Sequence, residues 1–189
     1  REQTVLEIAG PILDALDAGH RLAVSTVTQV LGSAPRTLGT AMAVSEVGAV
    51  LGSISGGCVE GEVYAVSGEV LTDGRCVLAQ FGVTDDDAFA AGLSCGGSLE
   101  LVVTELAGNG ARNAISAGLR AELTAARRGE QAGLAIVLDG PGVGTILAAG
   151  AGAEAAAQDT SGKFGLDDET VRRIQAEARA RLAAGSSGV

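Results

Sequence analysis

Aromatic side chains are scarce in this chain: they make up 2% of its 189 residues, and Trp is absent. Proteins that bind single-stranded nucleic acids stack bases on aromatic side chains, and nucleic-acid binders in general present a basic face. The chain carries 13 Lys and Arg against 23 Asp and Glu, a net charge of −10. This composition excludes nucleic-acid binding, and the negative charge also disfavours contact with an anionic membrane surface.

Cysteine and histidine are also rare, with three cysteines (Cys58, Cys76 and Cys95) and a single His. An odd number of widely spaced cysteines argues against a secreted disulfide framework. A structural zinc site is not expected, because there is no C-x-x-C pair and only one His. The sequence has neither a signal-peptide pattern nor a run of 18 apolar residues, so we expect a cytoplasmic protein with no membrane span.

What the chain does have is small aliphatic residues and 29 glycines, with 47% hydrophobic residues overall. Helical spacing predicts helices over residues 4–18, 58–72, 111–128 and 167–184. Strand patterns are found over residues 21–31, 41–45, 49–53, 75–81, 98–106, 134–138 and 143–148. This order predicts an α/β fold of α+β character, in which a mixed β-sheet has flanking helices and several hairpins. We expect one domain over 1–189, with its core in 4–150 and a C-terminal helix over 167–184.

A Gly-rich loop over residues 52–60 lies between a predicted strand and a predicted helix. Unpaired N–H groups at a helix N-terminus favour an anion, and Gly56 and Gly57 would let a ligand approach the backbone. Cys58 at this helix start would have its thiolate favoured. Ser53 and Glu60 complete the candidate set in this loop. The alternative, in which the glycines form only a tight turn and Cys58 is a small buried residue, stays open.

A second Gly pair follows Cys95, at Gly96 and Gly97, and again has a Glu three residues further on. The two Cys-flanked Gly pairs could face each other across one pocket, or could be a coincidence in a Gly-rich chain. Glu60 and Glu100 could be solvated or could bind loop backbone, and the sequence does not separate their roles.

A third loop over residues 32–39 contributes Ser33 and Arg36. The planar guanidinium of Arg suits phosphate or carboxylate, although a surface Arg in a turn explains it equally well.

Three other features carry less weight. The segment 140–144 lacks the last Gly of a dinucleotide fingerprint and is better explained as a hairpin turn. The acidic run 85–87 favours a solvated turn over a metal site. His20, next to Gly19, is interpreted as a residue at a helix C-terminus and not as a catalytic base.

The loops over 32–36, 52–60 and 93–97, in this order and spacing, resemble the xanthine dehydrogenase accessory factor family (XdhC/CoxI). The resemblance is strongest over residues 4–107. It implies an accessory factor, or chaperone, that binds the molybdenum cofactor (molybdopterin) as cargo, protects it and delivers it. The recipient would be the apo-enzyme of a molybdenum hydroxylase such as xanthine dehydrogenase or carbon monoxide dehydrogenase. A cysteine desulfurase and a second copy of the chain, forming a homodimer, are further expected partners.

Under this resemblance the loops would hold the cofactor, with the phosphate at the Gly-rich helix start and soft contacts from two thiols to molybdenum or its sulfur. The cofactor-binding candidates are Ser33, Arg36, Ser53, Gly56, Gly57, Cys58, Glu60, Cys95, Gly96 and Gly97. Cys58 and Cys95 are the candidate metal contacts. Many family members continue into a Rossmann-type domain, which this sequence is expected to lack.

Two alternatives to a cofactor chaperone stay open. An oxidoreductase using a nucleotide at the same loops would need an acid–base pair, for which the sequence offers only Glu60, Glu100 and the Asp85 cluster. A purely structural interaction domain would leave both Cys-flanked Gly pairs unexplained. We expect a binding protein with no catalytic residues of its own.

Overall fold

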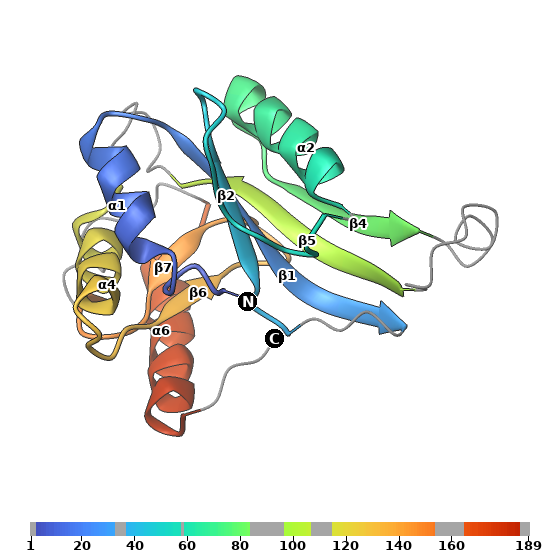
Figure 1. Ribbon diagram of the computed structural model, residues 1–189. Helices are drawn as coiled ribbons and strands as arrows, with labels where there is room; N and C mark the ends of the chain where they lie inside the picture. Colours follow the sequence, from blue (N-terminus) through green and yellow to red (C-terminus); the bar gives the residue numbers. More distant parts are fainter. Residues whose placement is uncertain are drawn as a thin grey trace.

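A five-stranded antiparallel sheet forms the centre of the protein (Figure 1). The computed structural model describes residues 3–32, 37–57, 59–83, 97–106, 115–153 and 165–185. The strands of the sheet are ordered β3-β2-β1-β5-β4. They span β1 (Leu22–Gly32), β2 (Ala41–Ser45), β3 (Val50–Gly52), β4 (Val77–Val83) and β5 (Gly97–Glu105).

Helices cover both faces of this sheet. Helix α2 (Glu60–Asp73) packs on one face, and α1 (Ala9–Asp17) and α4 (Ala117–Arg127) pack on the other (Figure 1). A separate antiparallel hairpin of β6 (Leu134–Ile136) and β7 (Ile146–Ala148) packs against α4 and α6 (Asp168–Ala183). None of the helices in the described ranges is long and apolar enough to cross a membrane.

The core is aliphatic, as the composition predicts, and it is divided by the sheet. On the α1 and α4 side, Ile12 and Leu123 pack with Leu22 and Val24 of β1. On the α2 side, Val63 and Val70 pack with sheet residues such as Leu101. Because apolar residues cover both faces of the first half of β1, residues 22–28 are all buried.

The predicted fold class is confirmed: helices and strands are mixed along the chain, and hairpins build the sheet. All the described strand pairings are antiparallel, so the sheet is not mixed in strand direction. The Asp139–Gly142 segment is a hairpin turn as predicted, with Gly140 and Gly142 at positive φ. The single-domain boundaries stay a prediction.

Two helix starts differ from the sequence prediction by more than one helical turn, and α2 and α6 start within two residues of the predicted positions. The first helix begins at Ala9 and not at Thr4, because Pro11 has no N–H to donate and is tolerated only in the first helical turn. The described part of α4 begins at Ala117, where the Ser116 side chain caps the helix by accepting the N–H of Leu119. The expected helical residues 111–114 lie outside the described part of the chain.

Candidate functional site

Two of the three candidate loops leave the sheet side by side. Gly32, the last residue of β1, is paired with Gly97, the first residue of β5. Gly97 is in turn paired with Val83, the last residue of β4. The first candidate loop follows Gly32, and the third lies between Val83 and Gly97. The ends of β1, β5 and β4 that flank these two loops therefore lie side by side, as neighbouring strands about 4.8 Å apart (Figure 1).

The second candidate loop starts from the same end of the sheet but further back. Strand β3 runs in the same direction as β1, because each is antiparallel to β2. Its last residue, Gly52, is level with Ser25 of β1 through their common partner Met42. The second loop therefore starts roughly 20 Å short of the other two along β1. That the three loops converge on one pocket stays a prediction.

Within the second loop, the carboxylate of Glu60 accepts hydrogen bonds from the loop that precedes it. Backbone N–H groups of Ser55, Gly56 and Gly57 donate to it at 2.8, 2.8 and 2.7 Å. The Ser53 hydroxyl donates at 2.8 Å, and the Ser55 hydroxyl also donates. Gly56 and Gly57 have φ of 77° and 126°, which lets the backbone turn its N–H groups toward one point.

This arrangement is an anion cradle that holds an anion of the protein itself. Burial tends to raise the pKa of Glu60, but the hydrogen bonds from Ser55, Ser53 and Gly57 outweigh it and hold the pKa far below its usual range. The Glu60 carboxylate is therefore ionised and fully engaged. A cofactor phosphate would have to displace this carboxylate before it could use the same three N–H groups.

The second glutamate, Glu100, lies in a different setting on β5. The hydroxyl of Thr28 is 3.0 Å from Glu100 Oε1 and 3.2 Å from its backbone oxygen. Thr28 is the extra residue of a β-bulge, because Val27 is paired with Leu101 while Gln29 is paired with Glu100. Among the described residues only Thr28 donates to the Glu100 carboxylate, and the residue is partly exposed. The structure thus gives Glu60 and Glu100 different surroundings, a difference that the sequence alone did not show.

The face of the sheet that bears Glu100 is polar toward the end from which the loops leave. By strand alternation this face is opposite α2 and includes Thr26, Gln29, Gln80, Ser98 and Glu100 together with one apolar residue, Leu31, and the bulge residue Thr28 contacts Glu100 on it. Helices α1 and α4 pack further back, over Leu22 and Val24. Thr26 is only 7% exposed, and its hydroxyl has no hydrogen-bond partner within the described structure. A buried hydroxyl without a partner is uncommon and is itself a candidate ligand contact.

The sequence-predicted site residues divide into two groups. The structure describes Ser53, Gly56, Gly57, Glu60 and Gly97, and brings the first four together around one carboxylate. Ser33, Arg36, Cys58, Cys95 and Gly96 lie outside the described residues, as does the acidic run 85–87. The described ranges contain no group of three His, Cys, Asp or Glu side chains that could hold a metal ion. Sequence reasoning missed Thr26 and Thr28; their alternation with apolar residues in β1 was the available signal.

Cys76 is half-buried and immediately precedes β4. Its sulfur lies near Thr104, whose hydroxyl donates to the backbone oxygen of Gly144 at 2.9 Å. Burial raises the pKa of the Cys76 thiol, and the nearby Thr104 hydroxyl only partly opposes this. Gly144 must be glycine here, since its φ is 85° and a Cβ would lie 2.6 Å from the Cys76 sulfur. Cys76 thus packs against Gly144 and Thr104, and it lies just before β4 and not within the strand as predicted from the sequence.

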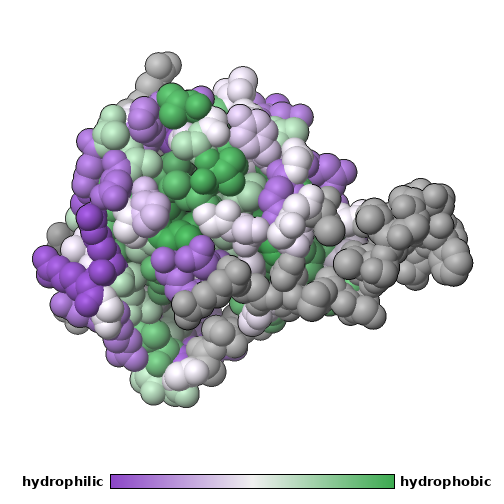
Figure 2. Space-filling view, viewed as in Figure 1, coloured by the Kyte–Doolittle hydropathy of each residue, from purple (hydrophilic) through white to green (hydrophobic). Residues whose placement is uncertain are grey.

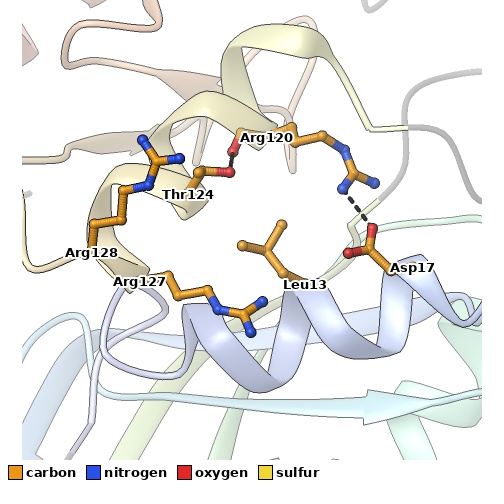
Figure 3. A pocket seen from close by; sticks show the side chains of 6 residues that line it. All are labelled: Leu13, Asp17, Arg120, Thr124, Arg127 and Arg128. Atoms are coloured by element: carbon orange, nitrogen blue, oxygen red, sulfur yellow. Dashed lines mark hydrogen bonds and ion pairs between the residues drawn. The ribbon is translucent and has the colours of Figure 1, made fainter.

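A hollow of about 460 Å³ lies between α1 and α4, away from the candidate loops (Figure 3). It is lined by Leu13 and Asp17 of α1 and by Arg120, Thr124, Arg127 and Arg128 of α4 and its C-cap. Arg120 is paired with Asp17 at 2.7 Å and Arg127 with Asp14 at 2.9 Å. These two ion pairs connect α1 to α4 across the hollow, so its charged side chains are already paired with each other.

The fold and the loop geometry define an α+β domain with Gly-rich loops at one end of an antiparallel sheet. Residues 15–82 match the model of the XdhC and CoxI family. The chain is 33% identical over 104 residues to the molybdenum cofactor insertion chaperone PaoD of Escherichia coli (strain K12). The resemblance to the XdhC and CoxI family is thereby confirmed.

The match to PaoD covers 55% of this chain and 31% of PaoD. A crystal structure of a xanthine dehydrogenase from Bacillus halodurans aligns with a TM-score of 0.50 at 19% identity. That alignment covers 70% of this chain and 37% of the Bacillus chain, and at this identity it shows a shared fold alone. The chain thus spans about a third of each relative. The first two candidate loops lie within the family match, and the third lies beyond it.

Proposed function

We propose that this chain binds the molybdenum cofactor as cargo and delivers it to the apo-enzyme of a molybdenum hydroxylase. The observation that carries the proposal is the similarity to PaoD, whose name describes insertion of this cofactor. The pairing of Gly32 with Gly97, and of Gly97 with Val83, supports the proposal, because the strand ends that flank the first and third candidate loops lie side by side. Xanthine dehydrogenase and carbon monoxide dehydrogenase are the proposed classes of recipient.

The described residues fit parts of such a cofactor. A pterin has ring N–H donors and ring acceptors, and the polar face offers a carboxylate at Glu100 and an unpaired hydroxyl at Thr26. The second loop is a poorer phosphate site, because the N–H groups of Ser55, Gly56 and Gly57 already donate hydrogen bonds to Glu60. Arg36 and Ser33 of the first loop are therefore the proposed phosphate ligands.

Cys58 and Cys95 are the proposed soft contacts to molybdenum or its sulfur. The test is to purify the Cys58→Ser, Cys95→Ser and Cys76→Ser variants from cells that make the cofactor. Molybdenum and pterin are then quantified per folded protein. We expect loss of cofactor from the first two variants and retention in Cys76→Ser, the matched control that precedes β4. Equal retention in all three would remove the thiols from the proposal, and absence of pterin from the unmodified protein would overturn the function itself.

The alternative function is a nucleotide-dependent oxidoreductase. It would need an acid–base pair near the loops. Of the two glutamates concerned, Glu60 is held as an ionised hydrogen-bond acceptor and is unsuited to proton transfer near neutral pH. Binding of a nicotinamide nucleotide by the purified protein, with turnover of hypoxanthine or an aldehyde, would favour the oxidoreductase over the chaperone.

Partner binding remains part of the proposal. A cysteine desulfurase would supply the sulfur of the mature cofactor, and its binding is testable by co-purification. The proposed homodimer has one structural support. Figure 2 shows apolar side chains gathered over the β2–β3 hairpin, where Val47 and Val50 are 64% and 48% exposed. Light scattering at micromolar concentration that gives a monomer mass would contradict the homodimer.

A further inference from the structure

We propose that Glu100 recognises the amino-substituted edge of the pterin ring and that Thr28, on the β1 bulge, positions it. The inference rests on the proposed function and deepens it by assigning the ring, as distinct from the phosphate or the metal, to the sheet face opposite α2. The juxtaposition of Thr26, Thr28 and Glu100 on this face carries the inference.

The bulge is the first observation. An extra residue in a strand bends it and redirects a side chain, and bulges are frequent beside binding sites. Here the extra residue is Thr28, and its redirected hydroxyl reaches the Glu100 carboxylate at 3.0 Å. Without the bulge, residues 28 and 29 of β1 could not both lie opposite Glu100. The irregularity in β1 therefore orients one carboxylate.

The charge and exposure of Glu100 are the second observation. It is the single ionisable side chain among the described residues of the polar face, and it is partly exposed. Each carboxylate oxygen can accept two hydrogen bonds, and Thr28 uses one site on Oε1. A 2-amino-4-oxopteridine presents two parallel N–H donors, from the ring nitrogen and the amino group. A carboxylate accepts such a pair in bidentate fashion.

The third observation is the unpaired hydroxyl of Thr26. It lies two residues before Thr28 on the same face, opposite Val102, and is more than nine-tenths buried. A buried hydroxyl without a partner destabilises the folded protein, because its hydrogen bonds to water are lost and not replaced. A ring nitrogen or carbonyl oxygen of a ligand on this face would accept its hydrogen bond.

Ser25 also has an unpaired buried hydroxyl, but its position is different. By alternation it lies with Ala23 and Val27 on the α2 face, where its exposure is 0%. No polar face adjoins it. Ser25 is therefore a matched control for Thr26: both are unpaired hydroxyls in β1, and only one adjoins the proposed site.

The test measures binding of two fluorescent probes to the purified full chain, pterin and lumazine. Lumazine has a carbonyl in place of the 2-amino group and so cannot offer the same pair of donors. We expect the unmodified protein to prefer pterin by about tenfold or more, since hydrogen bonds to a charged group are the strong ones. Glu100→Gln is expected to abolish this preference, and Thr28→Val to reduce it several-fold.

Two further variants separate ligand contact from folding. Thr26→Val is expected to weaken binding of both probes while leaving the melting temperature unchanged or higher, because it removes an unsatisfied hydroxyl. Ser25→Ala is expected to leave binding of both probes unchanged. If Glu100→Gln keeps the pterin preference, or weakens pterin and lumazine equally, the assignment of Glu100 is overturned.

The pterin content of the same variants, purified from cofactor-producing cells, distinguishes failure of this inference from failure of the proposed function on which it rests. Retained cofactor in the unmodified protein and equally in Glu100→Gln would overturn the inference alone. An unmodified protein that carries no cofactor and binds neither probe would overturn both the inference and the proposed function.

Discussion

Glu60 accepts the backbone N–H of Gly57, three residues earlier in the chain, at 2.7 Å. It is one of five hydrogen bonds that the loop before α2 donates to the Glu60 carboxylate. The loop conformation therefore depends on the charge of one side chain. It is fixed before any ligand arrives.

Glu60→Gln is expected to destabilise the protein at neutral pH by roughly 1–2 kcal/mol, because an amide presents one N–H₂ where two acceptor oxygens are needed. The folded-state pKa of Glu60 is held below its unfolded value near 4.5. Its stabilisation is therefore complete above that value and is lost as the pH falls below it. In thermal melts of both proteins from pH 7 to pH 3, the difference in stability should be constant above about pH 4.5 and should narrow as the pH falls below it. A constant difference across this range would contradict the role of the Glu60 charge.

Gly52→Ala is expected to destabilise the protein by about 2 kcal/mol or more. Gly52 has a φ of 76°, and an added Cβ would lie 2.8 Å from the backbone oxygen of Ala41 and 3.3 Å from the Ile8 side chain. Gly61→Ala is the matched control, because Gly61 lies in α2 with open space around it. That control should be neutral or stabilising by about 0.5–1 kcal/mol. Urea denaturation of the two variants compares them directly.

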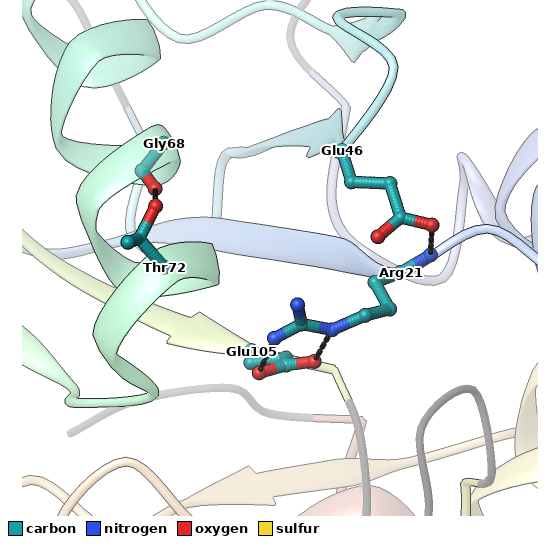
Figure 4. Close-up of polar contacts among 5 residues, drawn as sticks. All are labelled: Arg21, Glu46, Gly68, Thr72 and Glu105. Atoms are coloured by element: carbon teal, nitrogen blue, oxygen red, sulfur yellow. Dashed lines mark hydrogen bonds and ion pairs between the residues drawn. The ribbon is translucent and has the colours of Figure 1, made fainter.

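The Arg21–Glu105 pair is expected to contribute measurably to stability, whereas Arg127–Asp14 is not. Arg21 donates to both oxygens of Glu105 at 2.6 and 2.7 Å, and the side chains are 25% and 17% exposed (Figure 4). The hydrogen bonds that Arg21 donates to Glu105, opposed by partial burial, raise the pKa of Arg21. The Arg127–Asp14 pair is 49% and 66% exposed.

Double-mutant cycles with Arg21→Met and Glu105→Gln should give a coupling of about 1 kcal/mol or more, since bidentate geometry and limited exposure favour the pair. The same cycle on Arg127 and Asp14 should give a coupling near zero, as for most exposed pairs. Equal coupling in the two cycles would show that exposure does not decide the strength of these pairs.

Glu122→Leu is expected to be among the most destabilising single substitutions in the chain, by about 3 kcal/mol or more. Glu122 is 1% exposed, and its two oxygens accept the N–H of Gly133 at 2.9 Å and of Gly152 at 2.6 Å. Removing the carboxylate leaves two buried donors without partners. Arg120→Ala, a surface change on the same helix, serves as the control. Near-equal melting temperatures for the two variants would contradict this account.

Strand positions were well predicted from the sequence because alternation and Gly-rich turns are local signals. Residues 41–45 and the hairpin turn at 139–142 are examples. Glu122 was not recognised, because a charged residue in an amphipathic helix normally faces solvent, and its partners are 11 and 30 residues away. The engagement of Glu60 depends on the left-handed conformations of Gly56 and Gly57, which the sequence permits without requiring. The three-residue spacing between Gly57 and Glu60 was the only sequence feature that pointed to this contact.

The bulge at Thr28 also determines which face of the sheet each later residue of β1 occupies. Val27 and Val30 are three residues apart, yet both pack in the α2 cluster, because the extra residue resets the alternation between them. Deleting Thr28 would restore an uninterrupted ladder in which Val30 still pairs with Leu99 on the α2 side. The extra residue thus adds one hydroxyl beside Glu100 while Gly32 keeps its pairing with Gly97 and its side of the sheet.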